Sequence, residues 1–267
     1  MQIWDPDTGT SITLPGNTTN VVSVAWSPDG QRLATASSDR TVQIWDPDTG
    51  TSITLPGNTT NVVSVAWSPD GRLTAASSNR TVQIWDPDTG TSITLPGHGD
   101  WVLSMAWSPD GRSIATAGGD GKVRIWDPNT GTSITLSGHT NRSVAWSPDG
   151  QLLATAWDDG TVRMWDPDTR TSTLLAAHTD KVLSMAWSPD GRSFATASGD
   201  GTVRIWDLDT RTSSTLTEHT DNVLTLAWSP AGRLATGSNE GTVRIWDPAA
   251  RASSTLTEHT DNVVSVA

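Results

Sequence analysis

The chain has 267 residues, a formal net charge of −12 and no cysteine, and its 15 tryptophans stand beside one phenylalanine and no tyrosine. The missing cysteines exclude a disulfide framework, a thiolate zinc site and a thiol nucleophile, and an acidic chain without basic runs is a poor ligand for nucleic acid or an anionic membrane. No apolar run approaches the roughly 18 residues of a spanning helix, and no signal peptide is visible at the N-terminus, so we expect a cytoplasmic protein.

Tryptophan recurs along the chain in two ladders with a period of about 40 residues, which indicates a repeat architecture. The first ladder consists of Trp-Asp pairs, at Trp4, Trp45, Trp85, Trp126, Trp165, Trp206 and Trp246. The second lies in the motif Ala-Trp-Ser-Pro, at Trp26, Trp67, Trp107, Trp146, Trp187 and Trp228. Only Trp101 and Trp157 belong to neither ladder.

Each repeat reads as four short strands separated by turns rich in Pro, Asp, Asn and Gly. In the third repeat the predicted strands cover residues 102–107, 114–117, 123–126 and 132–136. No stretch has the 3.6-residue period of an amphipathic helix. The sequence therefore predicts an all-β fold.

The repeat resembles the WD-repeat (WD40) β-propeller family. The resemblance rests on Gly-His, then Ala-Trp-Ser-Pro-Asp-Gly, Ala-Thr-Ala-x-x-Asp-Gly and Thr-Val-Arg-Ile-Trp-Asp, and it covers the whole chain. It implies one domain over residues 1–267, a seven-bladed β-propeller of four-stranded antiparallel blades. The six full blades would cover about 20–56, 61–97, 101–137, 141–177, 181–217 and 222–257. A partial seventh blade would comprise residues 1–15, as strands c and d, plus residues 259–267, as strand a, with strand b missing.

The repeats are near copies, since residues 2–30 and 43–71 are identical, and they resemble recently amplified bacterial tandem WD arrays. Two interpretations of the seventh blade follow. We favour a fragment of a longer repeat array or of a multidomain signalling protein. In the alternative, both termini share the seventh blade, and the gap in it promotes self-association.

The resemblance also implies a chain of hydrogen-bonded side chains in each blade, made by a histidine, a strand-b Ser or Thr, an aspartate and the strand-c tryptophan. Its members would be His98, Thr116, Asp120 and Trp126 in the third blade; His139, Thr155, Asp159 and Trp165 in the fourth; and His178, Thr196, Asp200 and Trp206 in the fifth. The strand-b member stays open, because a serine two residues on, such as Ser198, shares the same face. The sixth blade replaces the aspartate with Glu240, and the first two replace the histidine with Asn17 and Asn58.

Because these side chains recur with the repeat, we interpret them as structural rather than catalytic. The five histidines fall one per repeat, so we predict no metal site, no cofactor and no enzymatic activity.

Departures from the repeat are the internal signal for function. They give a candidate partner-binding surface at Trp101, Arg142, Trp157, Asp158 and Lys181, residue types that include the Trp and Arg of interaction hot spots. The alternative is drift, in which each extra tryptophan only fills space between blades. We predict a non-catalytic scaffold or sensor that binds a protein or peptide, with the acidic chain favouring a basic partner; the alternative is a structural module that self-assembles through its incomplete blade.

Overall fold

The computed structural model describes residues 2–4, 11–14, 20–56, 61–137, 141–176, 178–210, 212–248, 250, 252–256 and 261–263. Backbone contacts divide the chain into two compact units, residues 1–137 and 138–267, and each is considered by itself. The described residues form antiparallel sheets and contain no helix, which confirms the all-β prediction. The assignment of residues 1–267 to one domain stays a prediction.

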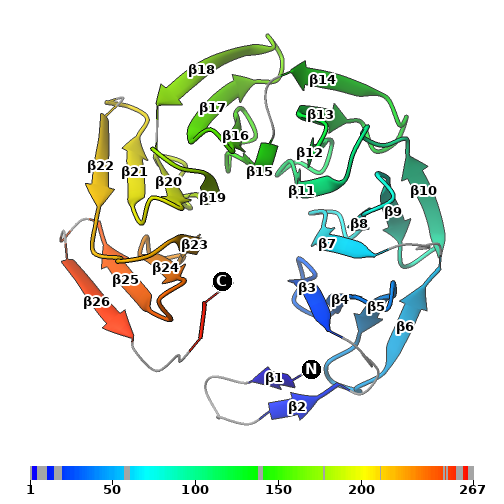
Figure 1. Cartoon of the computed structure of the whole chain (residues 1–267). Coiled ribbons are helices and arrows are strands. Elements are labelled where there is room, and N and C mark those ends of the chain that lie inside the picture. The colour runs from blue at the N-terminus through cyan, green and yellow to red at the C-terminus, as the bar shows by residue number, and fades with distance from the viewer. Residues whose placement is uncertain are drawn as a thin grey trace. The chain divides into compact units, whose positions relative to one another are not determined.

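The first unit contains one two-stranded sheet and three four-stranded sheets, in which the strands follow each other in chain order (Figure 1). The two-stranded sheet pairs β1 (Gln2–Trp4) with β2 (Ser11–Thr13). The first blade comprises β3 (Val21–Trp26), β4 (Leu33–Ser37), β5 (Val42–Trp45) and β6 (Ser52–Leu55). The second comprises β7 (Val62–Trp67), β8 (Leu73–Ser77), β9 (Val82–Asp86) and β10 (Thr91–Leu95). The third comprises β11 (Val102–Trp107), β12 (Ile114–Gly118), β13 (Lys122–Trp126) and β14 (Ser133–Ser137).

The second unit contains three further blades of the same topology. The fourth blade comprises β15 (Asn141–Trp146), β16 (Leu153–Trp157), β17 (Thr161–Asp166) and β18 (Thr171–Ala176). The fifth comprises β19 (Val182–Trp187), β20 (Ser193–Ser198), β21 (Val203–Asp207) and β22 (Thr212–Leu216). The sixth comprises β23 (Val223–Trp228), β24 (Leu234–Ser238), β25 (Val243–Asp247) and β26 (Ala252–Leu256).

The register within a blade brings its two repeat tryptophans to the same level. In the third blade Ile114 pairs with Trp107 on one side and with Trp126 on the other. The second strand, β12, is buried along its whole length. Burial on both faces explains why this strand consists of one large residue, Ile114, followed by alanine, threonine and glycine instead of alternating apolar and polar residues.

In the first five blades, the turn after the first strand follows from its Ser-Pro-Asp-Gly sequence. In the third blade the Ser108 hydroxyl donates to Asp110 Oδ1 at 2.6 Å, and Gly111 N donates to the Ser108 carbonyl at 2.9 Å. Gly111 has φ of +69°, which favours glycine at the end of this turn.

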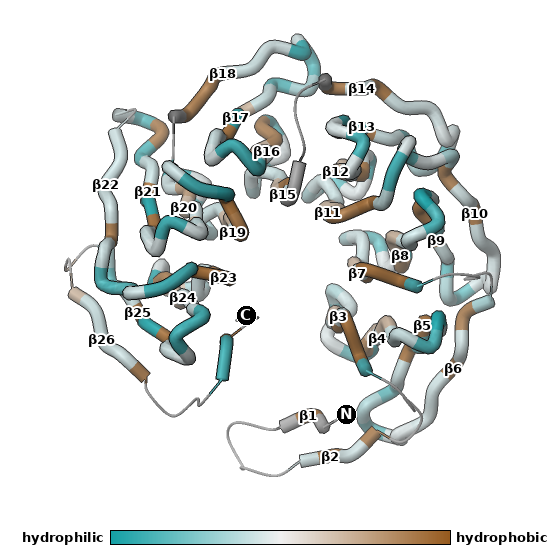
Figure 2. Tube along the Cα trace, in the orientation of Figure 1, coloured by the Kyte–Doolittle hydropathy of each residue, from teal (hydrophilic) through white to brown (hydrophobic). Residues whose placement is uncertain are grey.

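Neighbouring blades of a unit are joined through the second tryptophan ladder. The indole N–H of Trp67 donates to the Ala25 carbonyl of the preceding blade at 3.0 Å. In the second unit, Trp228 repeats this contact with the Ala186 carbonyl at 3.2 Å. Figure 2 shows apolar stretches along the first strands β7 and β11, which contribute Val62, Val65 and Met105 to the cores between blades. Within each unit, the second ladder thus holds a blade against the one before it, through Trp67, Trp107, Trp187 and Trp228.

The partial blade is present as its predicted strands c and d. Gln2 of β1 pairs with Thr13 of β2, and Leu14 packs with Leu33 and Trp45 of the first blade. Most of the predicted strand a, residues 259–267, lies outside the described residues. Within it, Val263 N donates to the Ser238 carbonyl of the sixth blade at 3.1 Å. The described strands therefore form six complete blades and one incomplete blade, as predicted.

Candidate functional site

The third blade contains the complete chain of hydrogen bonds expected for the repeat. Trp126 Nε1 donates to Thr116 Oγ1 at 2.8 Å, and Thr116 Oγ1 lies 2.8 Å from His98 Nε2. His98 Nδ1 lies 2.9 Å from Asp120 Oδ1, and the second oxygen of Asp120 accepts the backbone N–H of Gly99 at 2.7 Å. A single assignment satisfies every group: the threonine donates to Nε2, and Nδ1–H donates to the carboxylate.

Burial sets the charge states of this chain. It lowers the pKa of His98 below its ordinary value, more than the hydrogen bond to Asp120 raises it, so the imidazole is neutral. Burial also opposes ionisation of Asp120, but the hydrogen bonds from Gly99 N and His98 outweigh it and lower the pKa to about 2. The neutral imidazole of His98 therefore connects the loop before β11 to Thr116 of β12 and to Asp120 in the turn after β12.

The fifth and sixth blades repeat the arrangement. His178 Nε2 lies 2.8 Å from Thr196 Oγ1, and Trp206 Nε1 donates to the same oxygen at 3.4 Å. Asp200 accepts from His178 at 3.1 Å. In the sixth blade Glu240 Oε1 lies 2.8 Å from His219 Nδ1, so the longer carboxylate closes the chain as an aspartate does. Threonine, not the serine two residues on, accepts from the tryptophan in these blades.

The fourth blade contains part of the arrangement among its described residues. Trp165 Nε1 donates to Thr155 Oγ1 at 3.0 Å, and Asp159 Oδ1 accepts from Thr161 N at 3.0 Å. His139 lies outside the described residues. Trp157 Nε1 also donates to Thr155 Oγ1, at 3.1 Å.

The second blade shows what a change of one position does to these bonds. Its second strand has Thr74 and Ala75 where the first blade has Ala34 and Thr35. Because successive side chains point to opposite faces of a sheet, Thr74 turns away from Trp85 and accepts from Trp107 Nε1 of the third blade at 2.9 Å. Trp85 Nε1 donates instead to the Pro56 carbonyl at 3.1 Å. The threonine has moved from a bond within its blade to a bond between blades.

Trp101 is the exposed aromatic residue among the predicted partner-binding residues. It lies directly before β11, and its side chain is 55 % exposed. Its backbone is fixed, because Gly119 N donates to the Trp101 carbonyl and Trp101 N donates to Asp100 Oδ1, both at 2.8 Å. A large apolar side chain is therefore held in solvent on an ordered backbone in the first unit.

Trp157 does not belong to an exposed surface, which corrects the expectation for this residue. It is the last residue of β16, pairs with Asn141, and is 1 % exposed. Its position is taken by the buried residues Ser37, Ser77 and Ser198 in other blades. The position lies inside the sheet, so a tryptophan there is buried rather than presented to a partner.

The remaining three residues lie in the second unit. Lys181 is exposed directly before β19, and its carbonyl accepts from Gly199 N at 3.0 Å. Asp158 is half-buried in the turn after β16, and this turn contacts the loop before Lys181, since His178 N donates to the Gly160 carbonyl at 3.0 Å. Arg142 lies in β15, and its side chain is outside the described residues.

The structure also contains a groove that the sequence analysis did not predict. It lies between the fourth and fifth blades and has a volume of about 480 Å³. It is lined in part by Leu152, Met164, Leu174 and Leu208. Each of these residues departs from the repeat, and comparing every position of the copies, rather than loops and tryptophans alone, would have found them.

Neither a metal centre nor a membrane-spanning helix is present in the described part of the chain. No three His, Cys, Asp or Glu side chains are grouped there so that they could hold a metal ion. No helix among these residues is long and apolar enough to cross a membrane.

Comparison with known families identifies the fold. The family model described as IFT122 first beta-propeller matches residues 1–172 and again residues 61–267. Overlapping matches are expected where similar repeats align with a model in more than one register. No functionally curated protein matches the chain. With its four-stranded antiparallel blades and its repeated Trp-Asp pairs, the chain belongs to this family of WD40-type β-propellers.

Proposed function

We propose that this chain is a non-catalytic scaffold that binds a protein or peptide through the surface around Trp101. Propellers of this type commonly serve as protein-interaction scaffolds. The polar side chains that resemble a catalytic set recur from blade to blade and are used to connect strands. We include a cytoplasmic location in the proposal, in keeping with a chain that has no cysteine.

The exposure of Trp101 carries this proposal. The same position holds Asn20, Asn61 and Asn222 in other blades, so the fold does not require an aromatic residue there. An exposed indole on a fixed backbone can bury a large area at small entropic cost, which is why tryptophan is enriched in binding hot spots. In the second unit, Lys181 occupies the same position, and with Asp158 it gives the surface there its polar character.

The test compares Trp101→Asn with the wild type. Peptides would first be selected from a random phage-displayed library on the immobilised wild-type protein, and their affinities then measured by isothermal titration calorimetry. We expect the variant to weaken binding by about 2 kcal/mol, roughly thirtyfold, as for a hot-spot residue. The melting temperature should not change, because the side chain is exposed and asparagine occupies this position in other blades.

Asn61→Ala is the matched control, since Asn61 lies at the same position of the second blade. It should leave the affinity within twofold of the wild-type value. Selected peptides that bind the Trp101→Asn protein as tightly as the wild type would contradict the proposal.

Self-assembly is the second candidate function, and the outer face of β3 favours it. Val24 is 53 % exposed, whereas the equivalent Val65 of the second blade is 5 % exposed beneath the first blade. Trp26 is also exposed, and its equivalent Trp67 donates to the preceding blade. The first blade thus presents to solvent an apolar face of the kind that joins blades elsewhere in the chain.

A further inference from the structure

Grooves recur between consecutive blades within each unit. Each lies between the last two strands of one blade and the turn that follows the third strand of the next. In the first unit, one groove is lined by Ile44, Ser52 and Pro87, and the next by Ile84, Ser92 and Pro128. In the second unit, the groove between the fifth and sixth blades is lined by Ile205, Thr215 and Pro248. The copies of this groove can therefore be compared position by position.

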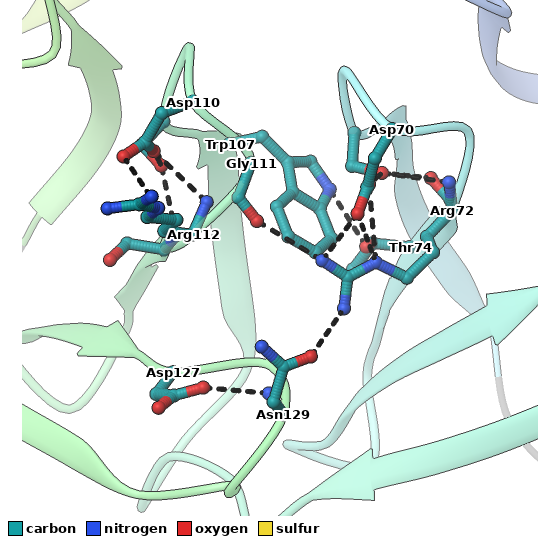
Figure 3. Close-up of polar contacts among 12 residues, drawn as sticks. Asp70, Arg72, Thr74, Trp107, Asp110, Gly111, Arg112, Asp127 and Asn129 are labelled. Carbon is teal, nitrogen blue, oxygen red and sulfur yellow. Dashed lines mark hydrogen bonds and ion pairs between the residues drawn. The ribbon is translucent and has the colours of Figure 1, made fainter.

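In the first unit an arginine crosses each of these grooves. Arg32 forms an ion pair with Asp88 of the second blade, with Nη2 and Oδ1 2.9 Å apart. Arg72 lies over the ring of Trp107, 5.1 Å from its centre, and donates to the Gly111 carbonyl at 3.1 Å (Figure 3). Its Nη1 also donates to Asn129 Oδ1 at 3.3 Å. In each of these two grooves, an arginine side chain, Arg32 or Arg72, thus connects one blade to the next. We call this arrangement the polar clamp.

The groove between the fourth and fifth blades has lost this clamp. Leu152 stands at the position of Arg32 and Arg72, directly before the second strand of its blade. Opposite it, Leu208 replaces the proline that follows the Trp-Asp pair in all other repeats. Both leucines pack against the core cluster that contains Met164 and Trp206. The floor of the groove is therefore apolar and continuous with the core of the second unit.

Two further changes make the same groove apolar. Leu174 of β18 stands where all other repeats have threonine, and Met164 stands where they have isoleucine. Leu174 is 50 % exposed and pairs with Arg163, on the opposite face of the sheet from Met164. It therefore lines the groove at the outer edge of β18 and does not fill the interior. The apolar end of β18 is visible in Figure 2. Four changes from separate places in the sequence converge on one groove, and an apolar surface of this kind, open to solvent, indicates a binding site.

The edge of the groove indicates what it binds. Residues 171–175 of β18 line it consecutively, and β18 is an outer strand of its sheet, paired there with β17 only. An outer strand can pair through its backbone with an extended peptide. Asp166 and Asp207 also line the groove, and no lysine or arginine is among its described lining residues. A basic peptide therefore complements its charge.

We propose that the groove formed by Leu152, Met164, Leu174 and Leu208 binds an extended peptide segment that alternates large apolar side chains with lysine or arginine. The peptide adds a strand to β18. Its apolar side chains enter the groove, and its basic side chains lie on the opposite face of the added strand. The negative charge of Asp166 and Asp207 at the groove attracts these basic side chains. The lining of this groove does not include Trp101.

The probe is a fluorescein-labelled, capped peptide of alternating lysine and leucine, with anisotropy as the measurement on the full chain. The first variant is Leu152→Arg, which places an arginine opposite Asp209, the equivalent of Asp88. Because this variant rebuilds the clamp that the first unit already uses, it should fold and keep the wild-type melting temperature. We expect it to weaken peptide binding at least tenfold.

A second variant, Leu174→Thr with Leu208→Pro, restores the repeat residues and should also weaken binding at least tenfold. The matched control is Thr215→Ser with Pro248→Ala in the neighbouring groove, which should stay within twofold of the wild type. A peptide of alternating glutamate and leucine should bind at least tenfold more weakly, and Trp101→Asn should have no effect on the lysine–leucine peptide.

Three outcomes would overturn the proposal. The first is the absence of binding of the lysine–leucine peptide up to roughly 1 mM, the weak limit of a useful affinity. The second is equal affinity for Leu152→Arg and the wild type, and the third is equal affinity for the lysine and glutamate peptides. Loss of binding in Trp101→Asn alone would assign the peptide to the surface around Trp101 and would likewise overturn this proposal.

Discussion

At the scale of single residues, Thr116 holds the polar chain of the third blade together. Its hydroxyl oxygen accepts from Trp126 Nε1 and lies 2.8 Å from His98 Nε2, and its side chain is fully buried. A buried donor or acceptor that loses its partner costs about 1–3 kcal/mol. One hydroxyl thus satisfies two ring nitrogens that would otherwise be unpaired.

We therefore expect Thr116→Val to lower the free energy of unfolding by about 2–4 kcal/mol, because it leaves two buried groups without partners in a site of the same shape. Urea unfolding followed by tryptophan fluorescence measures the change. Thr135→Val on the exposed strand β14 is the control and should change stability by less than about 0.5 kcal/mol. A Thr116→Val protein as stable as this control would show that the hydrogen bonds of the blade are not needed.

At the scale of strands, β3 differs from the other first strands in the exposure of one face. The two-stranded sheet β1–β2 packs Leu14 against Leu33 and Trp45 of the first blade. Val24 and Trp26, further along the same face, remain exposed. Uncovered apolar sheet faces and strand edges promote association with further chains.

If this face mediates assembly, the wild-type chain will show a mass that rises with concentration in size-exclusion chromatography with light scattering. Val24→Lys should abolish this rise, because burying a lysine in such an interface is costly. Ile53→Lys, which changes an exposed isoleucine on the outer strand β6, should leave it unchanged. A wild-type protein that stays monomeric at all concentrations would exclude the self-assembly function.

At the scale of the whole molecule, the repeated histidines make stability depend on pH. Burial lowers the pKa of His98, His178 and His219 in the folded state. The pKa of the Asp120 and Asp200 carboxyls is also lowered, to about 2, because hydrogen bonds outweigh the effect of their burial. In each case the folded state favours the deprotonated form, so the unfolded chain binds more protons.

We expect the melting temperature to be constant above about pH 7 and to fall as the pH drops below the ordinary histidine pKa of about 6.5. A second fall should begin near pH 4, where the carboxylates of the unfolded chain take up protons. His98→Asn introduces the residue found at this position in the first two blades. This variant should have a lower melting temperature at pH 8, and its melting temperature should decrease less steeply below about pH 6.5. An unchanged melting temperature between pH 7.5 and pH 5 would contradict this account.

The features that depend on the spacing of residues along the chain could be predicted from the repeat alone. Its period gave the four strands of each blade, and the recurrence of His98, Thr116, Asp120 and Trp126 with that period marked them as structural. The prediction that Trp157 is exposed was wrong. It relied on the position of Trp157 beside a turn, whereas the serines at the equivalent position in other blades are small enough for a buried strand position. The effect of Glu240 also required the structure, since only the geometry shows that the longer carboxylate reaches His219.

The sequence by itself thus determined the all-β repeat, because this depends on alternation and turn chemistry over short distances. Its resemblance to the WD-repeat family implied the blade topology and the residues that connect strands within a blade. Only the tertiary structure decided which departures from the repeat meet in space. It separated the exposed Trp101 from the buried Trp157, and it brought Leu152, Met164, Leu174 and Leu208 into one groove. The physical reason is that a groove between two blades combines side chains from different repeats, and no periodicity within a single repeat records how neighbouring blades pack.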